Sequence, residues 1–140
     1  MNRRPSYDAK EAAVTFFRAI EVPCIEVPDK DLLRVRYPTE TQIANTGIRF
    51  GEDSFSHSTL VAKLETDQLA PYTLEASQNP CRGVTIVTTP NGYVGVEGTL
   101  PYPQTRVGFE GSLVDTLSVN SNYIDNVHPR IMRSIKERNR

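Results

Sequence analysis

Apolar and polar residues alternate along much of the chain with a period of two, which is the pattern of half-buried strands. Residues 33–37 read LRVRY and residues 47–51 read GIRFG. Both segments predict strands whose apolar side chains enter a core, with Arg34, Arg36 and Arg49 on the solvent side. The further short strand candidates are 24–27, 72–76, 107–119 and 59–65, the last of which also fits a helix.

Two other segments show helical spacing. In residues 9–21, apolar positions recur every three or four residues, and Asp8 with Glu11 has the spacing of a capping box, with Ser6 as the alternative cap. A second helix is predicted at 129–138, where a proline suits the first helical position. The apolar stripe of this second helix is too narrow to fold alone. We therefore expect it to dock either on its own body or on a neighbouring subunit.

The segment TTPNGYVG, residues 88–95, predicts a hairpin with two alternative turns. A two-residue turn centred on Asn91 and Gly92 would leave both faces of the flanking strands mixed. A type I turn centred on Pro90 and Asn91, with Gly92 in a left-handed bulge, separates them almost completely. We prefer this second register. It places the following residues on the inner face: Val84, Ile86, Val94, Val96 and Leu100. It places these on the outer face: Thr85, Val87, Thr89, Tyr93, Glu97 and Thr99.

These elements predict an α+β fold that is mostly β. We expect an antiparallel sheet, as a sandwich or partly open barrel, with an N-terminal amphipathic helix and a short C-terminal helix. The ten prolines cut the chain into short pieces, and no linker or repeat divides it. The prediction is a single domain over 1–140, with a basic N-terminal arm at 1–6 and a basic C-terminal helix or tail at 129–140.

Composition and charge narrow the class of protein. Apolar residues make up 38% and charged residues 24% of the chain, as in globular domains that need no metal or disulfide to fold. No apolar run is long enough to cross a membrane, and no signal peptide is evident, so we expect an intracellular protein. The net charge of −1 is uneven: residues 1–4 carry +2 and residues 128–140 carry +4, which leaves −7 for residues 5–127.

Candidate chemistry is sparse. The polar run GEDSFSHS, residues 51–58, contains His57, but serine hydrolysis needs a nucleophile, a base and a carboxylate brought together by the fold. A loop is the preferred interpretation of this run, and a polar turn that of residues 115–126. His128 is a lone histidine that could cap the last helix or titrate near neutral pH. No phosphate-binding loop, metal site or cofactor motif is present, so we predict no catalytic, cofactor or metal residues.

The two cysteines, Cys24 and Cys81, have no metal-binding spacing. A disulfide between them is one alternative. Two thiols are favoured, because we expect a reducing compartment.

The absent chemistry and the charged ends favour a non-enzymatic structural subunit of a larger assembly, such as a virus or phage particle. Homo-oligomers or other subunits are the expected partners. The first alternative is nucleic-acid binding through the basic tails, and the second is a small hydrolase centred on His57. The predicted partner-binding residues are Arg3, Arg4, Tyr93, Arg130, Arg133, Lys136, Arg138 and Arg140.

Overall fold

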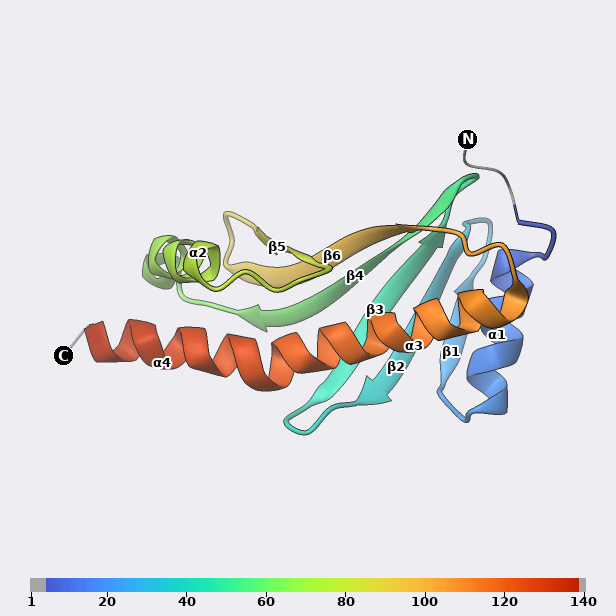
Figure 1. Cartoon of the computed structure of the whole chain (residues 1–140). Helices are drawn as coiled ribbons and strands as arrows, with labels where there is room; N and C mark the ends of the chain where they lie inside the picture. Colours follow the sequence, from blue (N-terminus) through green and yellow to red (C-terminus); the bar gives the residue numbers. More distant parts are fainter. Residues whose placement is uncertain (1–4, 139–140) are drawn as a thin grey trace.

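The computed structural model describes residues 5–138, which form one six-stranded sheet with helices on one of its faces (Figure 1). The strands are β1 (Cys24–Val27), β2 (Leu32–Pro38), β3 (Ile43–Phe50), β4 (Ser54–Lys63), β5 (Thr85–Thr88) and β6 (Tyr93–Pro101). The helices are α1 (Ala9–Ala19), η1 (Thr66–Gln68), α2 (Leu69–Gln78), α3 (Arg106–Asn122), η2 (Tyr123–Val127) and α4 (His128–Arg138).

Every neighbouring pair of strands is antiparallel, and their order in the sheet is β1-β2-β3-β4-β6-β5. The strand pairing of β4 with β6 shifts between Leu60 and Ala62, which is a bulge. A bulge reverses the alternation of the residues that follow it, so Lys63 shares a face with Leu60 although their numbers differ in parity.

The β5–β6 hairpin has the register that the sequence predicts. Thr85 pairs with Glu97 and Val87 with Gly95. Gly92 has φ +98 and its amide donates to the Thr89 carbonyl oxygen over 3.0 Å. The turn therefore carries the glycine bulge, and the prediction of its inner and outer faces is confirmed.

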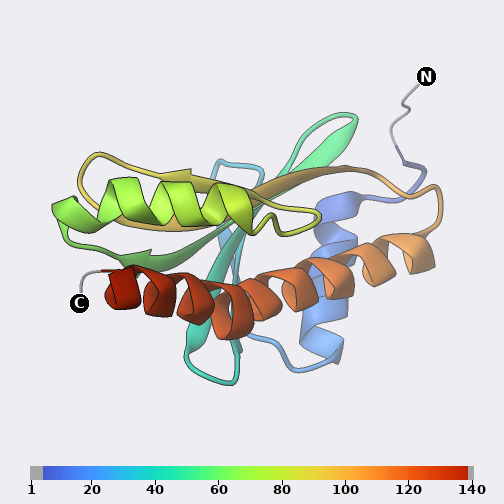
Figure 2. The same cartoon turned by 60° about the vertical axis from the view of Figure 1, so that its left-hand side comes forward.

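One long helical segment crosses the sheet (Figure 1). It consists of α3, the π-helical turn η2 and α4, which follow one another without a break from Arg106 to Arg138. At a rise of 1.5 Å per residue it is roughly 50 Å long. Figure 2 shows α2 lying beside α4, while α1 packs near the α3 end. The side chains of these helices cover one face of the sheet, which we call the covered face.

The predictions of both terminal helices are confirmed. α1 begins after Asp8, whose side chain accepts a hydrogen bond from the Glu11 amide over 3.1 Å. Within α4, Ile131 and Ile135 are buried against the rest of the same chain, beside α2. The narrow stripe therefore docks on its own body, and this leaves its basic side exposed.

Four local predictions were wrong. Residues 72–76 belong to α2 and residues 107–119 to α3, so neither is a strand. Residues 115–126 run from α3 into η2 instead of forming a polar turn. The run 51–58 is only partly a loop, because β4 begins at Ser54 and includes the rest of it.

The α+β class and the antiparallel sheet are confirmed. Helices account for 43% and strands for 31% of residues 5–138, and the sheet is a single open layer with helices in place of a second sheet. Its core joins the covered face to all four α-helices through the following large, fully buried residues: Phe17, Leu33, Ile48, Phe55, Tyr72, Val94, Phe109, Leu113, Tyr123 and Ile131.

Candidate contact surfaces

No helix of residues 5–138 packs against the second face of the sheet, which we call the open face. The strand register places these side chains there: Ile25, Val27, Leu32, Arg34, Arg36, Ile43, Asn45, Gly47, Arg49, Ser56, Ser58, Leu60, Lys63, Thr85, Val87, Tyr93, Gly95, Glu97 and Thr99. Along each strand these residues alternate with residues whose side chains lie on the covered face. The open face is thus the surface that the sheet presents to solvent.

Positive charge collects on the open face. Arg34 and Arg36 on β2, Arg49 on β3 and Lys63 on β4 are all exposed, and Glu97 is the acidic residue among the side chains named above. None of the three arginines makes an ion pair or a side-chain hydrogen bond within residues 5–138. Because the body as a whole is acidic, this face differs in sign from its surroundings.

The open face is also hollowed along β4 and β6. One hollow of about 680 Å³ is lined by residues that include Arg49, Ser56 and Thr99, and one of about 160 Å³ lies by Leu60 and Tyr93. Glu97 and Ser58 line both hollows, so the two lie next to each other.

Tyr93 lies on the open face at the hairpin end of β6, as the sequence predicts. Its side chain is 36% exposed, and the Lys63 ammonium lies 5.3 Å from the centre of its ring. The Tyr93 amide donates to the Thr89 hydroxyl over 3.1 Å, which fixes the backbone at the turn. Gly95 is the next residue of β6 on the same face. Because glycine has no side chain, the Tyr93 ring has no side-chain neighbour there.

The predicted basic residues of the C-terminus are separated by the fold into two groups. Arg130, Arg133 and Lys136 are exposed on α4, and we call these three the basic ridge. Arg138 instead lies 2.7 Å from the carboxylate of Glu75 on α2, whose side chain is 6% exposed. Arg138 therefore has an internal partner, whereas the ridge has none within residues 5–138. The other predicted arginines, Arg3, Arg4 and Arg140, lie outside the described residues.

A cavity of about 640 Å³ opens at the beginning of α1. It is lined by residues 5–10, by Asp31, by residues 50–52 and by Tyr102. Aromatic rings form part of its wall, and its polar lining includes the carboxylates of Asp8, Asp31 and Glu52 with one ammonium group, that of Lys10. The Lys10 ammonium donates to the Lys30 carbonyl oxygen over 3.2 Å and lies 4.0 Å from Glu26. Acidic groups therefore exceed basic ones in this lining, and we call it the acidic cavity.

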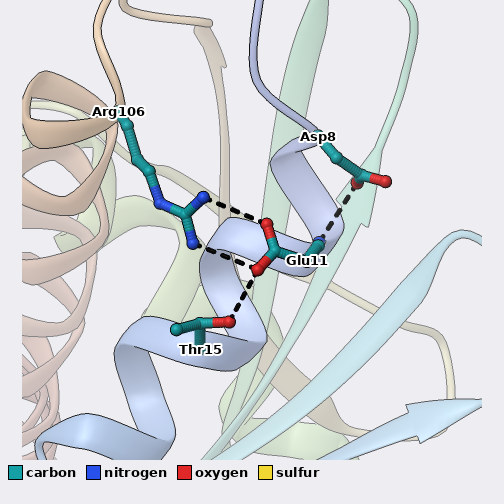
Figure 3. Close-up of polar contacts among 4 residues, drawn as sticks. All are labelled: Asp8, Glu11, Thr15 and Arg106. Carbon is teal, nitrogen blue, oxygen red and sulfur yellow. Dashed lines mark hydrogen bonds and ion pairs between the residues drawn. The ribbon is translucent and has the colours of Figure 1, made fainter.

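Glu11 directly follows the segment that lines the acidic cavity, and its charge is neutralised within the chain (Figure 3). Its carboxylate lies 3.1 Å from one guanidinium nitrogen of Arg106 and accepts from another over 3.2 Å, and the Thr15 hydroxyl donates to it over 2.9 Å. The hydrogen bonds from Arg106 and Thr15 lower the pKa of this carboxyl. The contact ties the first residue of α3 to α1, so this end of the long helix lies beside the acidic cavity.

His57 points into the covered face and is 3% exposed. Its Nδ1 lies 3.5 Å from the Asn120 side-chain nitrogen, and a side chain at Gly98 would collide with its Nε2. Burial lowers the pKa of this imidazole, which favours its neutral form. Within residues 5–138, neither a serine hydroxyl nor a carboxylate hydrogen-bonds to His57. The structure therefore does not show the nucleophile–base–carboxylate contacts that the hydrolase hypothesis needs.

His128 also has a structural contact. Its Nδ1 lies 2.8 Å from the Tyr72 hydroxyl, which in turn lies 2.8 Å from the Tyr123 hydroxyl. Burial lowers the pKa of His128 and raises the pKa values of both tyrosines. These three polar groups join α2 to the long helix, so His128 fastens two helices together.

No metal site or membrane span emerges from the described part of the chain. Residues 5–138 contain no cluster of three potential metal-ligating side chains, and none of their helices is both long and apolar enough to cross a bilayer. Cys24 and Cys81 are free thiols, each partly buried, and burial raises both pKa values.

The sequence matches no family model and no curated protein. Its fold is similar to that of YbjN from E. coli, a solved crystal structure described as "a putative transcription regulator". The two share 11% sequence identity with a TM-score of 0.60, over 86% of this chain and 91% of that one. At this identity the similarity concerns the fold alone.

Proposed function

We propose that the protein is a non-enzymatic subunit of an assembly, in which the basic ridge of one copy binds the acidic cavity of the next. One observation carries this proposal. The ridge and the cavity lie at opposite ends of one long helical segment, which begins beside the cavity at Arg106 and carries the ridge near its other end. From Arg106 to Arg133 the helix rises about 40 Å. The two surfaces therefore cannot meet within one molecule.

The acidic cavity has the chemistry to receive an arginine or lysine side chain. Asp8 and Asp31 supply negative charge, and Glu52, Tyr7 and Tyr102 are also among its lining residues. A guanidinium group is attracted both to carboxylates and to the faces of aromatic rings. A cavity of about 640 Å³ has room for such a side chain.

The basic ridge has the spacing to supply that side chain. Arg130, Arg133 and Lys136 are three residues apart, so they follow one slanting row on the exposed side of α4. The opposite side of α4 is anchored by Ile131 and Ile135, and its end by the Arg138 ion pair with Glu75. The ridge is thus presented on a helix that is fixed to the body.

A contact between two different surfaces is heterologous, and it produces either a closed ring or an open filament. A virus or phage particle is one setting in which copies of a small chain are joined in this way. Because exposed ion pairs contribute at most about 1 kcal/mol each, we expect an association that is weak and sensitive to salt.

Size-exclusion chromatography with light scattering tests this proposal on the full chain at tens of micromolar protein. We expect species larger than a monomer at low salt and monomers at high salt. The double substitution Arg133→Glu with Lys136→Glu should abolish the larger species, and so should Asp31→Lys with Glu52→Lys. The matched control, Arg34→Glu with Arg36→Glu, reverses two charges outside both surfaces and should leave association unchanged. A wild-type chain that is monomeric at low salt would refute the proposal.

A further inference from the structure

We infer that the open face of the sheet binds single-stranded nucleic acid. This surface is separate from the basic ridge and the acidic cavity, so the inference stands independently of the proposed assembly. The occupant is argued from the charge of the face, from the shape of its floor and from its exposed aromatic residue.

The clustered positive charges of the open face favour a polyanionic ligand. Arg34 and Arg36 are two residues apart on one strand, and Arg49 lies diagonally across from Arg34, a separation of about 7–8 Å between backbones. Like charges this close repel each other, and no carboxylate within residues 5–138 forms an ion pair with any of the three. A chain of phosphates would relieve this repulsion at several points, with release of counterions.

The floor of the open face suits planar bases. Between the arginines and the hairpin, the strands carry Gly47, Ser58 and Gly95, which keep the surface low. The two neighbouring hollows lie on this floor, one beside Arg49 and the other beside Tyr93. Bases can lie flat on such a surface and hydrogen-bond to serine and threonine hydroxyls, as on other sheets that bind single strands.

Tyr93 supplies a stacking platform at one end of this floor. Its ring is partly exposed and has Lys63 near it, and Tyr93 lines the smaller hollow together with Gly95. A base stacked on tyrosine brings its phosphate close to the neighbouring cation, which combines the two interactions that hold single strands on proteins. The arginines on β2 and β3 would then hold the backbone farther along.

Two other occupants fit the open face less well. A second copy packed face to face would bring one set of arginines close to another. An apolar protein partner would need a continuous apolar patch, yet Arg34 and Arg36 on β2 separate the exposed Ile25 on β1 from Ile43 and Leu60 on β3 and β4. An acidic peptide matches the charge but has no planar bases for Tyr93, and the experiment distinguishes it.

The test is fluorescence anisotropy with a labelled single-stranded oligonucleotide of about 12 nucleotides, in the range of known single-strand sites. We expect binding at low salt that weakens steeply as salt is added. Arg34→Ser with Arg36→Ser and Arg49→Ser should reduce affinity at least ten-fold, and Tyr93→Ala several-fold, whereas Tyr93→Phe should retain it. The matched control removes the basic ridge by Arg130→Ser, Arg133→Ser and Lys136→Ser and should bind like the wild type. Thermal melting should show that all variants fold.

Several results would overturn the inference. They are no binding at low salt, equal binding by the triple open-face variant, or loss of binding only when the basic ridge is removed, which would place the nucleic acid on the tail. Tighter binding of a duplex of the same length would contradict a single-stranded ligand. Equally tight binding of polyglutamate would show that the face selects acidic chains in general.

Discussion

The two faces of the sheet are built from alternate residues of the same strands, yet their chemistry differs. The covered face combines buried apolar side chains with a line of hydroxyls, in which Thr46 lies 2.8 Å from the Tyr37 hydroxyl and 2.6 Å from that of Thr59. The open face has small side chains and exposed arginines, and within residues 5–138 these arginines make no such bonds. Since the covered face is the one that packs the buried core, substitutions on the open face can change binding without changing the fold.

The largest difference in stability between the two faces is expected when a buried aromatic side chain is replaced by alanine. Phe55→Ala should lower the free energy of unfolding by about 3–5 kcal/mol, because Phe55 is 1% exposed and contacts the rings of Tyr102 and Phe109. Leu60→Ala on the open face of the same strand, where Leu60 is 56% exposed, should change it by less than about 0.5 kcal/mol. Urea denaturation measures both. Equal losses would mean that the open face is not a solvent face.

A smaller loss of stability is expected when the line of buried hydroxyls is interrupted. Thr46→Val keeps the shape of the side chain but leaves the hydroxyls of Tyr37 and Thr59 without a shared partner, which should cost about 1–3 kcal/mol of unfolding free energy. Thr85→Val is the matched change on the open face and should be close to neutral. Denaturant midpoints of the two variants decide between these outcomes, and a neutral Thr46→Val would contradict a structural role for the line.

A pH-dependent contribution to stability is expected from Asp125 in η2, whose carboxylate holds the β2–β3 turn. Desolvation alone would raise the pKa of the Asp125 carboxyl. Hydrogen bonds from Thr41 and from the Glu40 amide outweigh it, so this pKa is lowered. A lowered folded-state pKa stabilises the protein above the unfolded value of about 3.9 and loses this contribution as pH falls through the folded value. Asp125→Asn should therefore be less stable than wild type at pH 7, and the difference should shrink in acid.

Melting temperatures between pH 7 and pH 3 measure that difference for Asp125→Asn. Because Asp125 is partly exposed and its contacts with the turn lie at the surface, we expect this difference in stability to stay below about 1 kcal/mol. Asp115→Asn, at an exposed position on α3, is the control. A difference that grows toward acid would have the wrong sign for this explanation.

The smallest effect on stability is expected at Glu97, the acidic side chain of the open face. Glu97→Gln should leave the melting temperature within error, because the Glu97 side chain is exposed and makes no hydrogen bond or ion pair within residues 5–138. Affinity for a single-stranded oligonucleotide should nevertheless rise several-fold, since one repulsive charge is removed. A variant that melts earlier but binds unchanged would reverse the roles that we assign to the two faces.

The hairpin was predictable because apolar and polar residues separate cleanly on both of its strands. The helix α3 was not. Its buried side carries Thr116 and Asn120 as well as Phe109 and Leu113, while Val107 and Val114 are exposed. Polar residues inside and apolar residues outside cancel the helical pattern on which a sequence interpretation depends.

The helix α2 was hidden for a related reason. Tyr72, Leu74 and Ala76 alternate as in a strand, but Leu74 is exposed. The residue that completes the buried side is Glu75, whose burial depends on Arg138 from the far end of the chain. His57 shows the same limit, since its place in the core becomes evident only once β4 is paired on both sides.

The contact surfaces were only partly predictable. Tyr93 and the basic ridge could be named from sequence because each depends on one local element. The acidic cavity could not, because residues from three separate segments and Tyr102 meet there. The arginines of the open face were correctly assigned to solvent, but their convergence depends on strand register, which no local pattern specifies.

The proposed assembly is tested most directly by mixing two variants that cannot assemble alone. One carries Arg133→Glu and Lys136→Glu, and the other carries Asp31→Lys and Glu52→Lys, so each has like charges on its ridge and cavity. In a mixture every ridge again finds a cavity of opposite charge. Light scattering at low salt should show monomers for each variant and larger species for the mixture. A mixture that stays monomeric, while the wild type associates, would contradict a contact between ridge and cavity.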